Sequence, residues 1–174
     1  NKGKTVFVGD TSVHEYPSSE HLAEIAISSA RVVRLFGFDP KVAFVSHSTF
    51  GQPLTSRTKH IKNAVDILKG KNVDFKFDGD MQPDVALNDQ YKELYPFSEI
   101  VGNANILIMP GQHSAAISYK MMRELGGAKV IGPLLIGLGQ PIEIAPLRSS
   151  TSDILNLASI AAYSAGVINY NKKN

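Results

Sequence analysis

The sequence predicts an α/β fold in which a mostly parallel sheet carries helices on both faces. Short apolar runs of strand length alternate with longer segments of helical period, and no tandem repeat or low-complexity stretch interrupts them. Elements that alternate in this way form layered folds, because the crossovers between parallel strands place helices against the sheet. The length of 174 residues fits one ordinary domain or two small lobes.

The first half of the chain opens with a strand near 5–8 and continues with the clearest helix of the sequence. Ser18 is placed as its N-cap, and apolar residues then recur at three- and four-residue spacing as far as Gly37. An apolar run of strand length follows at 41–46, and residues 57–68 carry apolar side chains on one helical face. The pattern therefore predicts strand, helix, strand, helix.

The second half continues the alternation with shorter segments. We expect an acidic turn at 78–84 in which Asp84 caps the next helix, and a change of chain direction at Gly132-Pro133, where glycine frees φ and proline lacks an N–H. The expected elements are strands at 75–77, 105–109, 130–138 (broken at 132–133) and 141–144, and helices within 84–95 and at 114–125 and 153–165.

Composition excludes several classes of protein. A charged fraction of 20% with 43% hydrophobic residues is that of a packed domain, and the net charge of +2 favours neither nucleic acid nor a membrane as partner. The lack of cysteine excludes disulfides, thiolate zinc sites and a cysteine nucleophile. No apolar run is long enough for a membrane span or a signal peptide, so we expect a cytoplasmic protein.

Short motifs for common cofactors are missing from the sequence. It has no glycine-rich dinucleotide motif, no phosphate-binding lysine loop and no HExxH zinc pattern. The acidic run 78–84 fails as a calcium loop, since Pro83 stands where glycine is needed and Asp89 where glutamate is preferred. We therefore predict no metal site.

A hydroxyl-rich loop is the first candidate for anion binding. Ser46, Ser48 and Thr49 follow a strand in a loop that ends in Gly51, and such a loop presents N–H and O–H donors. His47 lies in the same loop, but a single histidine is more often a packing residue than a chemical participant. A functional and a purely structural role for the loop are about equally supported.

The arginines give two further candidates among only five in the chain. Arg148 lies among hydroxyl residues just before the last helix, where a guanidinium can bind a phosphate. Arg123 lies in the last turn of a helix, and Asp153 lies in the first turn of another. The helix dipole alone favours a cation and an anion at those places.

Longer sequence runs resemble a known family. They are similar, in order and over nearly the whole chain, to the C-terminal half of phosphate acetyl/butyryl transferases. The resemblance implies a two-lobed fold with coenzyme A in the cleft between the lobes. It also implies that residues 1–131 form the second lobe and that 132–174 return to a first lobe whose remainder is absent. The matching runs are 10–11, 17–26, 77–87, 95–97, 104–110, 117–120 and 132–137.

Two departures from the transferase pattern indicate a particular group of related proteins. The transferases carry a Ser-Arg pair shortly before the last helix, where this chain has Ala145-Pro146 or Pro146-Leu147, and Phe50 stands where they tend to have lysine. This form of the chain is similar to the transferase-like C-terminal domain of large bacterial NADP-dependent malic enzymes. The runs that carry this second resemblance are 46–51, 108–110, 113–118, 124–127 and 152–156.

The second resemblance implies a regulatory, acetyl-CoA-binding and homo-oligomerising domain that is itself non-catalytic. Its partner is a malic-enzyme domain that oxidatively decarboxylates malate to pyruvate, and NADP and a divalent metal would belong to that absent domain alone. The residues expected to bind acetyl-CoA or its anionic groups are Arg123, Arg148, Ser46, Ser48, Thr49 and Asp153.

Two alternatives stay open at the level of sequence. In an active phosphate acetyl/butyryltransferase, Asp153 would match a family aspartate that assists thiol deprotonation, and Arg148 would replace the missing arginine. In a purely structural module, the alanines of the last helix would support a contact between subunits.

Overall fold

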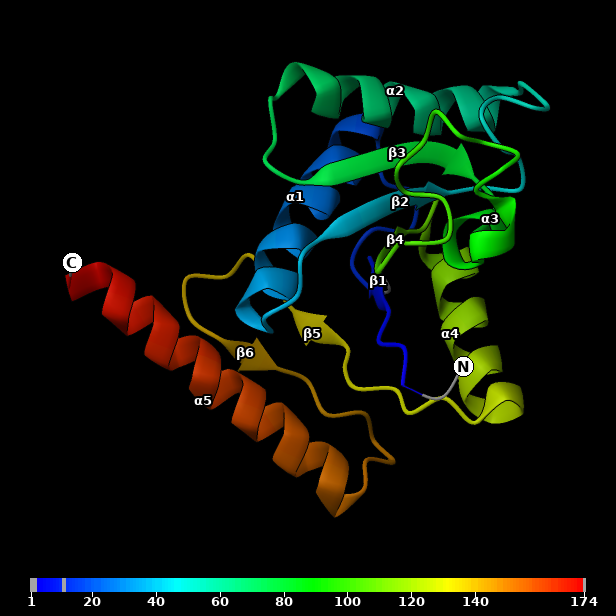
Figure 1. The fold of residues 1–174 in the computed structure, drawn as a ribbon. Coiled ribbons are helices and arrows are strands. Elements are labelled where there is room, and N and C mark those ends of the chain that lie inside the picture. Colours follow the sequence, from blue (N-terminus) through cyan, green and yellow to red (C-terminus); the bar gives the residue numbers. More distant parts are fainter. Residues whose placement is uncertain (1–2, 11, 174) are drawn as a thin grey trace. The chain divides into compact units, whose positions relative to one another are not determined.

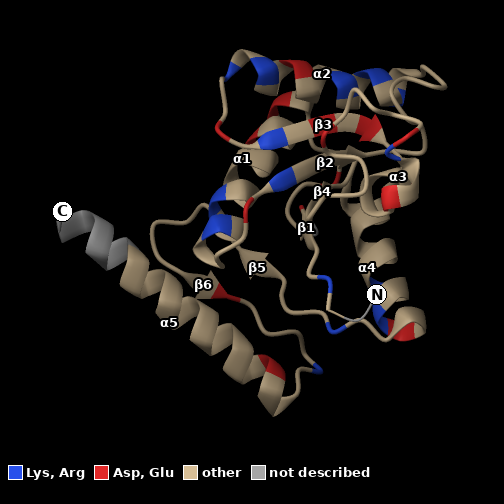
Figure 2. Ribbon diagram, viewed as in Figure 1, with Lys and Arg blue, Asp and Glu red and all other residues tan. Residues whose placement is uncertain are grey.

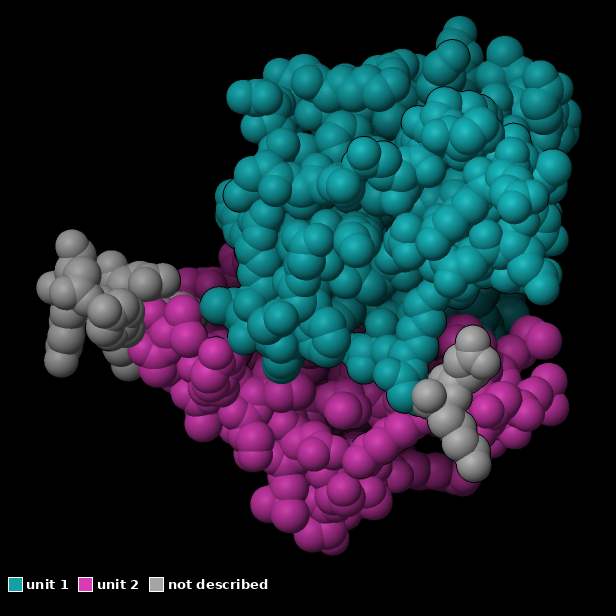
Figure 3. All heavy atoms as spheres, in the orientation of Figure 1, with its two compact units in different colours: residues 1–118 teal, residues 119–174 magenta. Residues whose placement is uncertain are grey.

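The computed structural model describes residues 3–10 and 12–173, with the side chains of this range up to residue 167. Thr11, part of the family motif at 10–11, lies outside the described residues. The chain divides into two compact units, residues 1–118 and 119–174, which Figure 3 colours separately. This division falls earlier than the boundary at 131/132 expected between lobes, which stays a prediction.

A parallel four-stranded sheet forms the centre of unit 1 (Figure 1). All of its neighbouring strands pair in parallel, in the order β1-β4-β2-β3. This confirms the fold class that the alternating pattern predicts. The strands are β1 (Phe7–Gly9), β2 (Lys41–Val45), β3 (Lys76–Met81) and β4 (Ile106–Ile108).

Helices α1 (Ser19–Leu35) and α2 (Ser56–Gly70) pack on one face of this sheet. Each begins with a capping box: the hydroxyl of Ser18 accepts from the N–H of His21, and that of Thr55 accepts from the N–H of Thr58. The apolar stripes of both helices meet alternate residues of β2 and β4. The fully buried side chains of this core include Leu22, Val33, Val42, Phe44, Leu68, Ile106 and Ile108.

The opposite face of the sheet packs against α3 (Pro83–Leu87), the 3₁₀ turn Asp89–Tyr91 and the start of α4 (Gln112–Gly126). The intervening residues of the same strands point to this side, because side chains alternate along a strand. Helices therefore cover both faces, as predicted. The second core includes Ala43, Val45, Met81, Val85, Ile100, Leu107 and Ala115.

Strand β3 is longer than the sequence predicts, and the expected turn at 78–84 is wrong. Residues 78–81 are strand, and the N-cap of α3 is Gln82, with Pro83 in the first turn. Phe44 of β2 pairs with Gly79, whereas Val45 pairs with Met81, so Asp80 is an extra residue in the ladder. Such a β-bulge needs no apolar alternation, and for that reason the hydrophobic pattern does not reveal it.

Unit 2 holds a small antiparallel pair and a long helix. Strands β5 (Leu134–Leu135) and β6 (Ile142–Glu143) pair antiparallel, and α5 (Thr151–Lys173) extends well beyond the helix expected at 153–165. The part of the chain that the structure describes contains no helix both long and apolar enough to cross a membrane.

Candidate functional site

A buried polar cluster lies at the carboxyl ends of β2 and β3. Ser46, Ser48 and Thr49 of the loop after β2 are 9%, 0% and 6% exposed, and Asp80 of β3 is 1% exposed. The carboxyl ends of parallel strands are the usual place for ligands in open α/β sheets. In Figure 2 acidic positions mark this end of β3.

Asp80 holds the loop that follows β2. Its carboxyl group accepts hydrogen bonds from the Ser48 hydroxyl and, at 3.0 Å, from the Gly51 N–H. Its backbone carbonyl accepts from the Phe50 N–H at 2.6 Å. Three hydrogen bonds from the loop thus depend on one bulged residue. The sequence does not reveal this role, because Asp80 is one of three acids in the run 78–84 and only the fold buries it.

Phe50 sits within an aromatic cluster at this loop. Its φ of +50° lies in the left-handed region, which a residue with a Cβ occupies only when its surroundings hold it there. The ring packs against Phe97 and Tyr95, with centroid distances of 4.8 and 5.4 Å, and Phe97 is 69% exposed. The loop after β2 therefore presents an aromatic surface.

The structure brings the three candidate hydroxyl residues together, with their side chains turned into the protein. The Ser46 hydroxyl accepts from the Ser48 N–H at 3.2 Å, and the Thr49 hydroxyl accepts from the Gln82 N–H at 3.2 Å. The Ser48 hydroxyl donates a hydrogen bond to the Asp80 carboxyl group. His47, by contrast, is exposed. Anion binding by these residues stays a prediction, and their observed bonds are structural.

A second carboxyl group, Asp10, follows β1 at the same edge of the sheet. It accepts from the N–H groups of Ser12, Val13 and His14 at 2.9–3.0 Å, and His14 Nδ1 lies 2.7 Å from its Oδ2. Burial alone would raise the pKa of Asp10, but these hydrogen bonds together hold the pKa below its ordinary value. In the sequence Asp10 stands out only as part of the run 10–11.

Asp153 and Arg123 lie in unit 2. Asp153 completes a capping box at the start of α5: its Oδ2 accepts from the N–H and hydroxyl of Ser150 at 2.9 and 2.8 Å, and its own N–H donates back to the Ser150 hydroxyl. Hydrogen bonds from Ser150 lower the pKa of Asp153, and the charges of Lys129 and Arg123 add to the effect. The structure therefore brings Arg123 near Asp153, while Arg123 Nε donates to Glu124 at 2.7 Å.

Arg148 lies in the loop before α5 and is exposed. Among the residues whose side chains the structure describes it has no hydrogen-bonding or ion-pair partner, so its guanidinium is available to an external anion. The described residues also contain no group of three His, Asp or Glu side chains placed to hold a metal ion.

Comparison with known proteins places the chain in a family. The profile of the phosphate acetyl/butaryl transferase family matches residues 1–162. An NADP-dependent malic enzyme of Rhizobium meliloti is 50% identical over 165 residues, which are 95% of this chain and 22% of that protein. A phosphate acetyltransferase of Clostridium acetobutylicum is 37% identical over 158 residues, 90% of this chain and 47% of that protein.

A solved structure shows the same fold. The crystal structure of a phosphotransacetylase from Streptococcus pyogenes superposes with a TM-score of 0.90 at 34% identity, covering 95% of this chain and 50% of that one. The chain thus spans about half of a transferase and about a fifth of the malic enzyme that it matches. The resemblance to the transferase-like part of NADP-dependent malic enzymes is confirmed, and the chain belongs to the phosphate acetyl/butaryl transferase family.

Proposed function

We propose that this chain is a catalytically silent, acetyl-CoA-binding regulatory domain of an NADP-dependent malic enzyme. The observation that carries the proposal is the segment before α5, where a chain of transferase fold has Ala145-Pro146-Leu147 in place of the Ser-Arg pair. Loss of a group that stabilises charge in the transition state lowers a rate by orders of magnitude, whereas a binding site persists on its other contacts. Binding without turnover is the function that this combination supports.

Acetyl-CoA carries several phosphate charges, and the two candidate arginines suit them. Arg148 is exposed and Arg123 is engaged only with its neighbour Glu124, so both guanidinium groups are accessible to a phosphate. Ser46, Ser48 and Thr49 would contribute by fixing the loop that presents Phe50, since their side chains are bonded within the protein. Asp153 would contribute by capping α5 beside these arginines.

The alternative function is an active phosphate acetyl/butyryltransferase that moves an acyl group between coenzyme A and phosphate. The transferases among the relatives favour it. Its general base would be Asp153, but the hydrogen bonds from Ser150 lower the pKa of that carboxyl group and make it a weak base. Formation of acetyl phosphate from acetyl-CoA and phosphate by the intact protein would support the transferase and overturn the silent domain.

The remainder of the parent protein is the proposed partner, together with a second copy of the chain. Unit 2 exposes many large apolar side chains that a stable subunit normally covers. The catalytic malic-enzyme domain, with NADP and a divalent metal, would lie outside these residues. The most exposed of the apolar side chains are Leu147, Leu125, Leu155, Ile144 and Tyr163.

Replacing Arg148 by alanine tests the proposal in the intact protein. The concentration of acetyl-CoA that gives half of its effect on malate oxidation should rise about tenfold, as expected for one lost charge-assisted phosphate contact. Arg57→Ala is the matched control, because Arg57 is also an exposed arginine but lies at the start of α2. Equal sensitivity of wild type and Arg148→Ala to acetyl-CoA would remove Arg148 from the site.

A further inference from the structure

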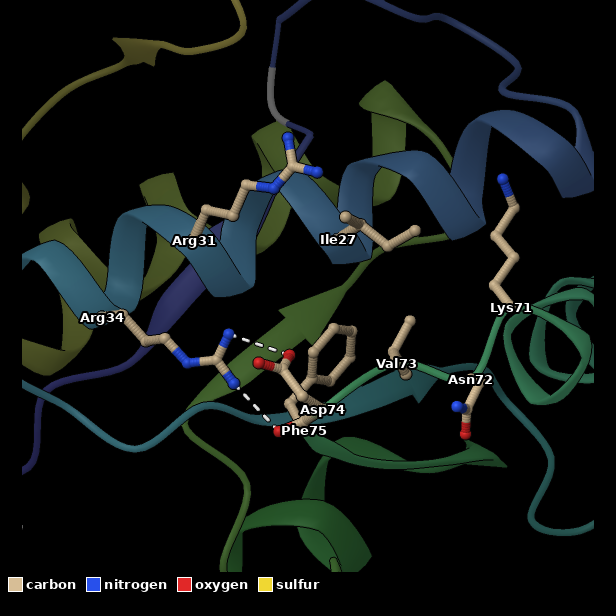
Figure 4. A pocket seen from close by; sticks show the side chains of 8 residues that line it. All are labelled: Ile27, Arg31, Arg34, Lys71, Asn72, Val73, Asp74 and Phe75. Carbon is tan, nitrogen blue, oxygen red and sulfur yellow. Dashed lines mark hydrogen bonds and ion pairs between the residues drawn. The ribbon is translucent and has the colours of Figure 1, made fainter. Parts of the chain in front are cut away.

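A hollow with a volume of about 540 Å³ opens on unit 1 beside the start of β3, at the opposite end of that strand from the polar cluster (Figure 4). It lies between the later turns of α1 and the segment 71–75, which leads from the end of α2 into the start of β3. One part of its lining is basic and another part is apolar. The basic side chains are Arg31, Arg34 and Lys71, and the apolar ones are Ile27, Val73 and Phe75.

The three cations of the hollow differ in how well they are neutralised. Arg34 is paired with Asp74: its Nη1 lies 3.0 Å from Asp74 Oδ1, and its Nη2 donates to the Asp74 backbone carbonyl at 2.9 Å. Figure 4 shows both of these interactions. Lys71 is paired less closely, with its Nζ 3.8 Å from Glu24 Oε1. Arg31 has no hydrogen-bonding or ion-pair partner among the residues whose side chains are described.

The position of Arg31 is not explained by the helix dipole. A cation is favoured in the last turn of a helix, which accounts for Arg34 at the end of α1 and for Lys71 just after α2. Arg31 lies a turn earlier on α1, three residues before Arg34, and Asp74 pairs with Arg34 and not with Arg31. Figure 2 shows further basic positions at the starts of β2 and β3. An anion in the hollow would give Arg31 a partner of opposite charge.

The apolar part of the hollow is suited to a flat ring. The Phe75 ring is half-buried and is held edge-on by Phe77, with centroids 6.0 Å apart, so it is fixed without a ligand. Ile27 and Val73 add aliphatic surface beside it. The volume lies within the usual range for pockets that take small organic ligands and exceeds the need of inorganic phosphate.

We propose that this hollow binds a nucleoside phosphate, with Arg31 and Lys71 on the phosphate groups and the base against Phe75. The site lies where α1 and α2 end and β3 begins, whereas the acetyl-CoA candidates of unit 1 follow the carboxyl end of β2. It is therefore a separate ligand site, through which a second ligand would act on the regulatory domain. The proposal does not depend on acetyl-CoA binding.

Hydrogen exchange of the intact protein, read by mass spectrometry with increasing ADP, tests this site. ADP should slow exchange in peptides that cover 27–35 and 70–76, and binding elsewhere does not interfere because exchange is read peptide by peptide. In Arg31→Ala the ADP concentration for half protection should rise about tenfold. Arg57→Ala, which removes a similar exposed charge at the other end of α2, should leave it unchanged.

Three results would overturn the proposal. The first is no protection of 27–35 and 70–76 by ADP, and the second is the same ADP dependence in Arg31→Ala and wild type. The third is protection by pyrophosphate at the same concentrations as ADP, because the apolar wall at Phe75 would then contribute nothing. Phe75→Leu keeps an apolar wall but removes the flat ring, and it should weaken protection by ADP without affecting any protection by pyrophosphate.

Discussion

Replacing Asp80 by alanine is expected to destabilise β2 and β3 by about 2–5 kcal/mol, because it leaves one buried and one half-buried donor without an acceptor. These donors are the Ser48 hydroxyl and the Gly51 N–H, which reach separate oxygens of the same carboxyl group. Each unsatisfied buried group carries a desolvation penalty of about 1–3 kcal/mol. Urea-dependent hydrogen exchange in peptides from β2 and β3 of the intact protein measures the loss.

A double-mutant cycle separates the Asp80 interaction from general damage. Removing Ser48 together with Asp80 should cost little more than removing Asp80 alone, since the two side chains share one buried bond. Asp66→Ala serves as the control, because Asp66 is an exposed acid of α2 whose pair with Lys69 contributes only tenths of a kcal/mol. Strictly additive effects of Asp80→Ala and Ser48→Ala would show that the carboxyl group does not hold the loop.

Replacing Gly79 by alanine is expected to cost about 3–5 kcal/mol, the sum of backbone strain and a steric clash. Gly79 has a φ of +149°, which side chains rarely permit. An added Cβ would lie 2.7 Å from the Phe44 carbonyl oxygen and 2.8 Å from Phe44 Cβ. Neither atom is the end of a flexible side chain, so β2 and β3 would have to separate next to the bulge that positions Asp80.

Gly70 provides the matched control for this substitution. It lies at the end of α2 without an unusual φ, and an added Cβ would meet nothing within 4 Å. Gly70→Ala should be neutral or stabilise the protein by about 0.4–1 kcal/mol, because alanine restricts the unfolded chain. The same hydrogen-exchange measurement compares the two variants, and equal stability of Gly79→Ala and wild type would contradict the observed packing of β2 against β3.

The regular part of the fold follows from sequence patterns that are local. Ser18 and the apolar stripe after it predict α1 and its cap, and the run at 41–46 predicts β2, because hydrophobic spacing and capping chemistry act within a few residues. The same patterns predict the two apolar faces of the sheet. These elements need no knowledge of distant contacts.

The parts that sequence analysis misses depend on contacts between distant segments. Asp80 lies in a strand because β2 pairs with the residues on either side of it, and the loop 46–51 supplies donors to its carboxyl group and carbonyl. The extension of α5 beyond 165 likewise has no apolar stripe to signal it, because the sequence after Ile168 is almost entirely polar. Polar residues that form structure through long-range bonds escape a reading based on hydrophobic period.

In the candidate site, too, the sequence predicts the places of some residues but not the contacts between distant ones. The sequence places Arg148 before a helix and Asp153 in the first turn of that helix, and the structure has both there, with Asp153 in a capping box. It does not predict that the Ser48 hydroxyl donates a hydrogen bond to the buried Asp80, because the two residues lie 32 positions apart in the chain. Family resemblance supplies candidate residues, and the bonds that these residues already make decide which of them are accessible to a ligand.

Regulation by acetyl-CoA requires more than a site. A ligand shifts an equilibrium between two arrangements only by the difference of its affinities for them. In the proposed domain this difference would arise where Arg123 and Arg148 contact the ligand, and its effect would reach the malic-enzyme domain through the assembled protein. A variant that binds acetyl-CoA normally but no longer responds to it would locate the coupling outside the site.

Calorimetric titration of acetyl-CoA into the intact protein, followed by addition of phosphate and an assay for acetyl phosphate, distinguishes a silent acetyl-CoA-binding domain from a transferase. We expect saturable binding of acetyl-CoA and no acetyl phosphate. Absence of binding would contradict the acetyl-CoA-sensing domain, and formation of acetyl phosphate would contradict its catalytic silence.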